Sequence, residues 1–330
     1  MVTCSPFKRV SSLVTQLRNG AILGSTEASL KVLNEIKDAS RECTLKEFRK
    51  YLQEAVPSFI EGRPTSILMR NLVRKYLEQI LRAGKEGGFR SVVEKTPETV
   101  DSIVKEVEEV KKAVVEVGSR RLSDGATLMI HSYSSTVIRL VMKAFEEGKK
   151  FKVFVTESRP IGEGRITASV LGRAGLDVTL IVDSAVRYVM KRVTDVLFSA
   201  DAVAANGAVI NKVGTSVVAL AAKEARVRTY VVAGTYKFGL ETVFGELVEG
   251  MVLNDASLIM HPEQATELAG KVLVRAPLFD VTPPEYIDAI ITEVGVVAPQ
   301  AIPLVIKEKY GWPPKVARVN DLLKEVVGIE

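Results

Sequence analysis

The stretch from Asp201 to Thr215 holds the residue types best suited to chemistry in this chain. Asp201 follows a short apolar run and precedes an Asn206-Gly207 turn, an Asn211-Lys212 pair and a Gly214-Thr215 step that opens a helix-like segment. A strand, a turn and a helix start in this order place one carboxylate beside donors able to hold an anion. The stretch therefore predicts a site for a phosphate-bearing ligand. The alternative is a tight turn whose glycine supplies a positive φ and whose lysine is solvated.

From Asp124 onward, strand-like runs alternate with helix-like segments, which predicts a parallel sheet with crossover helices. Such a sheet binds ligands at the carboxyl ends of its strands. Polar residues stand at each of these ends, which favours one shared site. The candidates are His131, Ser132, Arg159, Asp183, Asp201 and Lys237. The predicted strands are Thr127 to Ile130, Lys152 to Thr156, Val178 to Asp183, Val196 to Ala200 and Thr229 to Ala233.

Two of these candidates have a simpler interpretation that stays open. A lone histidine such as His131 is more often satisfied in the core than bound to a ligand. Asp201 could brace the neighbouring turn. In the closing segment, Asp280 and Glu285 could face a ligand, although a capping or bracing role in a turn is the safer interpretation.

The N-terminal part, from Lys8 to about Arg121, has helical periodicity. Thr44 with Glu47 forms a capping-box pattern, and Thr96 with Pro97 predicts the start of a long apolar-striped helix. Gly20 and Ala21 lie in a loop that could offer backbone amides to an anion, and Arg63 could offer a guanidinium. Alternatively, the glycine ends one helix and Arg63 is solvated.

Composition and net charge limit the kinds of ligand and the compartment that we expect for this chain. The chain has 330 residues, 47% of them hydrophobic, and a net charge of +5 that is spread along the chain. This balance suits an anionic ligand but does not indicate direct nucleic-acid binding. Two cysteines and two histidines without ligand spacing make a metal site unexpected, and no cofactor is expected. No run reaches the length of a membrane span, so we expect a cytoplasmic protein.

The Gly162-Glu163-Gly164 loop resembles a dinucleotide fingerprint only weakly, because a threonine takes the third glycine position and the loop follows the second strand, not the first.

Several segments together resemble a known family. They are Asn206 to Thr215, Glu157 to Pro160, Val182 to Ala185, Thr235 to Phe238 and Phe279 to Tyr286. They look like the family that unites the alpha, beta and delta subunits of translation initiation factor 2B with methylthioribose-1-phosphate isomerase and archaeal ribose-1,5-bisphosphate isomerase. The resemblance implies an α/β fold, with a helical N-terminal domain (1–122) and a Rossmann-like domain (123–330). It also implies a ligand cleft between them and homodimers that can assemble into hexamers.

The same resemblance implies roles for individual residues. The catalytic aspartate of the enzymes matches Asp201, and their phosphate-handling Asn-Lys pair matches Asn211 and Lys212. Their catalytic cysteine falls on Ser132, whose hydroxyl does not titrate near neutral pH unless a partner base activates it. A glutamine of the enzymes appears as Glu163, which we expect to weaken the binding of a doubly phosphorylated sugar.

Two functions follow from the resemblance. The leading expectation is a non-catalytic regulatory protein like the alpha subunit. Such a protein would bind a phosphorylated sugar or a nucleotide in the cleft, and a contact with initiation factor 2 stays an open alternative. The alternative is ribose-1,5-bisphosphate isomerase. In that case Asp201 is the general base, Asn211 and Lys212 hold phosphate and oxyanion, and Arg63 and Arg159 clamp phosphate.

Overall fold

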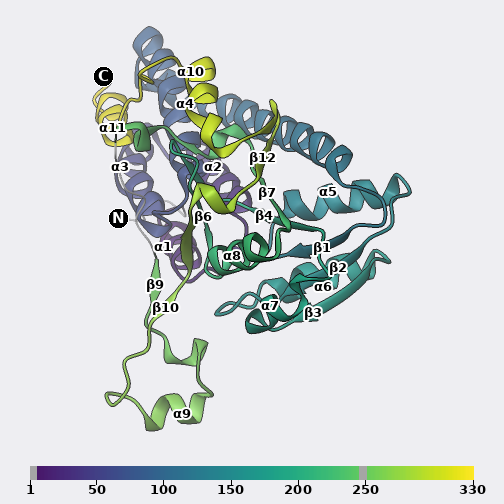
Figure 1. Ribbon diagram of the computed structural model, residues 1–330. Coiled ribbons are helices and arrows are strands. Elements are labelled where there is room, and N and C mark those ends of the chain that lie inside the picture. Colours follow the sequence, from purple (N-terminus) through teal and green to yellow (C-terminus); the bar gives the residue numbers. More distant parts are fainter. Residues whose placement is uncertain (1–5, 245–250) are drawn as a thin grey trace. The chain divides into compact units, whose positions relative to one another are not determined.

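The computed structural model describes residues 6–244 and 251–330 (Figure 1). The chain forms two compact units, one of Met1–Val110 with Tyr310–Glu330 and one of Lys111–Lys309. The C-terminal segment thus groups with the helical unit, whereas the expected domains run from 1 to 122 and from 123 to 330. Those expected domain boundaries stay a prediction.

The helical unit is built from amphipathic helices around an apolar core. Phe48, Tyr51 and Phe59 of one helix are fully buried there. The capping box of Thr44 and Glu47 is confirmed, since the threonine hydroxyl accepts from the Glu47 amide and the glutamate accepts from the Thr44 amide. The helices are α1 (Pro6–Arg18), α2 (Ser25–Glu42), α3 (Leu45–Gly62), most of α4 (Ile67–Arg121) and α11 (Val319–Val327).

Helix α4 passes through the predicted helix start at Thr96 and Pro97, so that prediction is wrong. Its helical geometry is interrupted earlier, at Gly87 and at Gly88, which has a φ of 69°. Only glycine adopts such a conformation at little cost, so the glycine pair, and not the proline, divides the helix.

The second unit holds a seven-stranded, mostly parallel sheet in the order β13-β12-β7-β4-β1-β2-β3. Figure 1 shows β1, β2 and β3 side by side. The predicted α/β fold class is confirmed. The strands are β1 (Thr127–Ile130), β2 (Lys152–Thr156), β3 (Asp177–Ile181), β4 (Asp195–Ser199), β7 (Arg228–Val232), β12 (Ala289–Thr292) and β13 (Gly295–Val297). The helices of this unit are α5 (Ser135–Glu146), α6 (Gly164–Arg173), α7 (Val186–Met190), α8 (Thr215–Ala225), α9 (Pro262–Glu267) and α10 (Ile302–Tyr310).

A second, four-stranded sheet carries the Asn211-Lys212 pair. Its order is β11-β6-β5-β8, and Gly207, with a φ of 84°, forms the turn between β5 and β6. The pair therefore ends a strand and does not lie in a loop. The strands are β5 (Ala202–Ala204), β6 (Val209–Lys212), β8 (Phe238–Gly239) and β11 (Phe279–Thr282).

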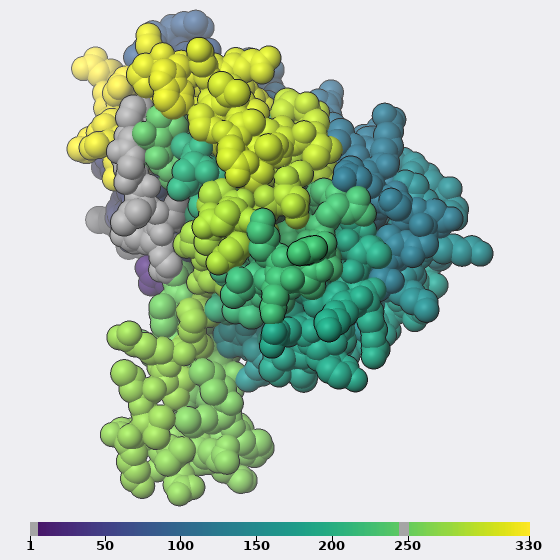
Figure 2. All heavy atoms as spheres, in the orientation of Figure 1, coloured from purple at the N-terminus to yellow at the C-terminus, as the bar shows by residue number. Residues whose placement is uncertain are grey.

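The segment from 251 to 278 forms an arm within this unit (light green in Figure 2). Its base is a two-stranded ribbon of β9 (Val252–Leu253) and β10 (Ala276–Pro277), and it carries the short helix α9. No helix among residues 6–244 and 251–330 is long and apolar enough to cross a membrane.

Candidate functional site

Two serines occupy an unusual backbone conformation at the carboxyl ends of adjacent strands. Ser132 follows β1 with a φ of 71°, and Ser158 follows β2 with a φ of 61°. The Ser132 amide donates to Ser158 Oγ at 2.8 Å, and Thr167 Oγ1 donates to the Ser132 carbonyl at 2.9 Å. Non-glycine residues in the left-handed region cost free energy and cluster at functional sites. The surrounding hydrogen bonds hold Ser132 in this conformation.

The Ser132 side chain belongs to a buried cluster of three residues. Its hydroxyl donates to Glu163 Oε1 at 3.1 Å, and Lys212 Nζ lies 3.5 Å from the same oxygen. Glu163 is 2% exposed and Lys212 6%. Lys212 Nζ also lies 5.0 Å from the centre of the Phe279 ring, a cation–π distance. We call this the Ser132–Glu163–Lys212 cluster; it joins a hydroxyl, a carboxylate and an ammonium group from three elements.

His131 is buried beside this cluster, and both its ring nitrogens are used within the protein. Nδ1 lies 2.7 Å from Thr156 Oγ1, and Nε2 lies 3.0 Å from the Val213 carbonyl. Because a carbonyl only accepts, Nε2 carries the proton. Burial lowers the pKa of His131, which favours the neutral ring. These contacts favour the open alternative of a histidine satisfied in the core.

Asp201 lies just beyond β4 and is 4% exposed. Its amide donates to the Ile210 carbonyl at 2.9 Å, which ties the end of β4 to β6. Lys237 Nζ donates to the Ala200 carbonyl at 2.7 Å and to Ser199 Oγ at 3.2 Å. Lys237 therefore positions the backbone directly before Asp201. Because β4 pairs with β1 in parallel, Asp201 and Ser132 stand at the same edge of the sheet.

The N-terminus of α8 was expected to help hold an anion, and the structure corrects this expectation. The Gly214 amide donates to Asp280 Oδ2 at 2.7 Å, and the Ser216 amide donates to the same oxygen at 3.2 Å. Asp280 thus caps the start of α8, whereas the expected capping or bracing role was in the turn of its own segment. Burial raises the pKa of Asp280 to about 6, while the two backbone donors act in the opposite direction.

Asn211 and Arg159 make contacts inside this unit. Asn211 Nδ2 donates to Thr215 Oγ1 at 2.9 Å, which positions its amide at the end of β6. The Arg159 amide donates to Asp183 Oδ2 at 2.7 Å, and its exposed guanidinium donates to the Leu258 carbonyl in the arm. The role of Arg159 as a phosphate clamp stays a prediction.

Gly20, Ala21 and Arg63 belong to the helical unit. Gly20, with a φ of 73°, follows the end of α1, and the Ala21 amide donates to the Gln16 carbonyl at 3.1 Å. The loop thus has the geometry of a helix end. Arg63 is 2% exposed and donates to the Ile22 carbonyl at 2.8 Å, so the alternative of a solvated arginine is wrong. Whether these residues complete a cleft with the second unit stays a prediction.

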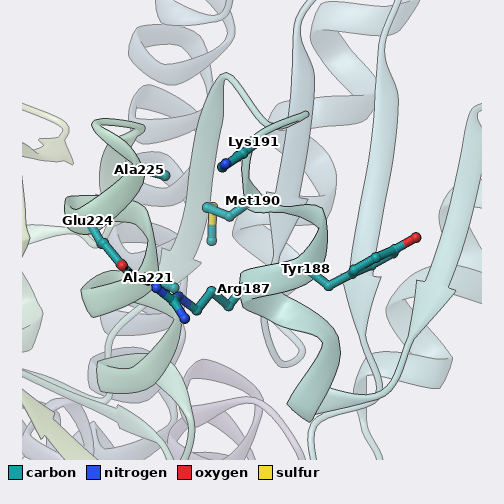
Figure 3. A pocket seen from close by; sticks show the side chains of 7 residues that line it. All are labelled: Arg187, Tyr188, Met190, Lys191, Ala221, Glu224 and Ala225. Carbon is teal, nitrogen blue, oxygen red and sulfur yellow. Dashed lines mark hydrogen bonds and ion pairs between the residues drawn. The ribbon is translucent and has the colours of Figure 1, made fainter.

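A pocket of about 560 Å³ lies between α7 and α8, away from the predicted residues (Figure 3). Arg187 and Glu224 pair across it through Nε and Oε2 at 2.9 Å. None of the sequence-predicted site residues lines this pocket. In the described part of the chain, no group of three or more His, Cys, Asp or Glu side chains is arranged to hold a metal ion.

The second unit thus places Ser132 and Asp201 at the same edge of the seven-stranded sheet. It also joins Ser132 to Lys212 through Glu163, which was not among the predicted site residues. Glu163 was noted only as a departure that weakens phosphate binding, because its contact with Ser132 spans 31 residues of sequence. Its place between two glycines in the turn that joins β2 to α6 could have indicated it.

Comparison with known proteins identifies the family. The model of the initiation factor 2 subunit family matches residues 19–299. The chain belongs to the initiation factor 2 subunit family. The chain is 39% identical over 303 residues to ribose 1,5-bisphosphate isomerase of Methanocaldococcus jannaschii, covering 91% of this chain and 93% of the relative. It is 33% identical to methylthioribose-1-phosphate isomerase of Thermosipho africanus over 320 residues, or 90% and 88% of the two chains.

Solved structures of the initiation factor 2 subunit family confirm the fold. The translation initiation factor eIF-2B of Pyrococcus horikoshii matches with a TM-score of 0.75 and 27% identity, over 88% of this chain and 98% of that one. A chain of the tetrameric eIF2B beta–delta complex of C. thermophilum matches with a TM-score of 0.67 over 93% of this chain and 96% of that one. At 18% identity, this second match shows the fold alone. That neighbouring chain comes from a tetrameric complex.

The named relatives contradict the leading functional expectation. Five archaeal relatives that are 35% to 39% identical to this chain are named ribose 1,5-bisphosphate isomerase, so the regulatory, alpha-subunit-like function was wrong. A role in translation initiation has no support beyond family membership. The expectation rested on a Ser132 hydroxyl that does not titrate near neutral pH unless a partner base activates it, and the fold places a buried carboxylate beside this hydroxyl.

Proposed function

We propose that this protein is an aldose–ketose isomerase that converts ribose 1,5-bisphosphate to ribulose 1,5-bisphosphate. The observation that carries the proposal is the buried Ser132–Glu163–Lys212 cluster, which lies at the same sheet edge as Asp201. The names of the archaeal relatives support the substrate.

The reaction needs two proton transfers. The furanose ring opens as its C1–O4 bond breaks, so the ring oxygen gains a proton. Hydrogen moves from C2 to C1 as a hydride, and the O2 hydroxyl loses its proton as C2 becomes a ketone. The site therefore needs one group that gives a proton and one that accepts a proton. Asp201 is one of them, and the second stands at the position of Ser132.

The phosphate groups need cationic and amide donors. Asn211 and Lys212, the latter a member of the cluster, end β6 and suit one phosphate. Asp280 already occupies the Gly214 and Ser216 amides, so α8 offers fewer donors than its sequence predicts. The roles of Arg63 and Arg159 as phosphate clamps are part of this proposal.

The test is phosphorus NMR of the purified full chain with ribose 1,5-bisphosphate, beside a control without protein. Methylthioribose 1-phosphate serves as the competing substrate, because both isomerase names occur among the relatives. We expect conversion of the bisphosphate and little conversion of the monophosphate. Conversion of neither sugar by folded protein would contradict the proposal.

Asp201→Asn keeps the size of the side chain but removes its acid–base function. We expect the turnover number to fall by about 10² to 10⁴-fold, the range of a lost general acid or base. The steady-state rate at saturating substrate measures this effect. Unchanged turnover would remove Asp201 from the mechanism.

A further inference from the structure

We propose that Glu163 is the base that activates Ser132, and that the Ser132–Glu163 pair takes the proton from the O2 hydroxyl of the sugar. The inference rests on the proposed function and assigns its second proton-transfer group. Ser132 touches the substrate in this scheme, and Glu163 acts through Ser132.

The geometry of the pair supports this role. The Ser132 hydroxyl donates to Glu163 Oε1 at 3.1 Å, and the left-handed backbone of Ser132 is held by Ser158 and Thr167. A carboxylate only accepts hydrogen bonds, so the hydroxyl proton of Ser132 points at Glu163. The lone pairs of Ser132 Oγ can then accept a proton from the substrate. This is the arrangement of an activated hydroxyl with its partner base.

The burial of Glu163 argues against a role in packing alone. A carboxylate removed from water is costly unless it is paired and hydrogen-bonded. Glu163 is 2% exposed. Its Oε1 accepts the hydrogen bond from the Ser132 hydroxyl and forms an ion pair with Lys212 Nζ at 3.5 Å. Lys212 thereby offsets the cost of the buried negative charge at the position where a proton acceptor is needed.

The proposed step conserves atoms and charge. The O2 proton passes to Ser132 Oγ as the Ser132 proton passes to Glu163. A hydride moves from C2 to C1, and the C1–O4 bond breaks with its electron pair going to O4. In this scheme the Ser132–Glu163 pair takes the role of general base, which the resemblance implied for Asp201, and Asp201 gives a proton to the ring oxygen. Exchange with solvent then removes the proton from Glu163 and returns one to Asp201, so no oxidant or reductant is required.

A double-substitution cycle tests the role of Glu163. Glu163→Gln should lower the turnover number by about 10²-fold in the natural Ser132 background. In a Ser132→Cys background, the same change should lower it by less than about fivefold, because a thiol with an ordinary pKa near 8.5 can lose its own proton. Glu163→Asp should recover part of the activity. Glu224→Gln, in the pocket between α7 and α8, is the matched control and should leave turnover unchanged.

Equal losses in the serine and cysteine backgrounds would overturn the inference, since Glu163 would then act independently of residue 132. Circular dichroism of each variant separates a lost base from a lost fold. A loss caused by misfolding would also lower activity in both backgrounds.

A second measurement does not depend on turnover. The thiolate absorbance of Ser132→Cys should rise at a pH about one unit higher with Glu163 than with Glu163→Gln, because a neighbouring carboxylate disfavours the thiolate. If the thiol of Ser132→Cys titrates at the same pH with Glu163 and with Glu163→Gln, the inferred contact between residues 132 and 163 is overturned. If this shift is present but the natural protein converts no sugar, the proposed isomerase function fails while the contact between residues 132 and 163 stands.

Discussion

Glu163 and Asp280 are two acidic residues of the same unit whose carboxylates have different kinds of hydrogen-bond partner. Glu163 accepts from one side-chain hydroxyl and pairs with one ammonium group. Asp280 is half-buried and accepts from two backbone amides at the start of α8. Backbone donors fix a helix end, whereas a hydroxyl and a lysine can exchange protons and bind an anion.

This difference shows that the partners of an acidic residue indicate its role better than its position in a motif. The sequence motif draws attention to the helix start at Gly214 and Thr215 as an anion site. The protein instead occupies that helix start with Asp280 and places its reactive carboxylate in a different loop. Three predictions test this contrast.

The largest effect is expected when the buried ion pair of Glu163 is broken. Lys212→Met removes the cation and should lower the free energy of unfolding by about 3 kcal/mol, the typical cost of an unpaired buried charge. Lys212→Met with Glu163→Gln should recover at least half of this loss, because no charge then remains buried. Urea unfolding of the single and double variants measures both values. A double variant no more stable than Lys212→Met would show that the pair is not coupled.

A smaller effect, with a defined pH dependence, is expected at Asp280. Its pKa is about 6 in the folded protein against an ordinary value of 3.8, so the folded state binds the proton more tightly. The contribution of Asp280 to stability is therefore greatest below pH 3.8 and decreases as the pH rises to about 6.

Compared with Asp280→Asn, the natural protein should lose about 1 to 2 kcal/mol of stability over this range, a value reduced for the partial exposure of the side chain. Urea unfolding at several pH values gives the difference. A constant difference between the two proteins would contradict the raised pKa.

The smallest effect is expected at Glu47, which caps α3 at the surface. The side-chain and backbone hydrogen bonds from Thr44 lower the pKa of Glu47, in the direction opposite to Asp280. Its contribution to stability is thus present above its ordinary pKa and is lost as the pH falls through the lowered value. The stability difference between the natural protein and Glu47→Gln should shrink on acidification. A difference that grows instead would contradict this direction.

Much of the fold could be predicted because strands and amphipathic helices follow local patterns. Strands β1 and β2 have the predicted bounds, and β4 and β7 differ by one residue at each end. The long helix was misplaced because its break depends on Gly87 and Gly88, whereas the proline-containing segment is accommodated within the helix. Local sequence patterns do not reveal whether the glycine pair or the proline interrupts the helix.

The candidate site could be predicted in part. Asp201, Asn211 and Lys212 were indicated by their spacing around one turn. The role of Glu163 was missed because it depends on contacts with Ser132 and Lys212, which are remote in sequence and meet only when the sheet forms. A capping role was expected for Asp280 in its own turn, but its capping of α8 depends on the register of β11 against β6.

The most direct test of the account is carbon NMR of ribose 1,5-bisphosphate labelled with carbon-13 at C2, incubated with the natural protein and no added thiol. The account predicts that the labelled carbon changes from a hydroxyl-bearing carbon to a ketone, and that this change is lost in Asp201→Asn. A labelled carbon that keeps its hydroxyl group in the presence of folded natural protein would contradict the account.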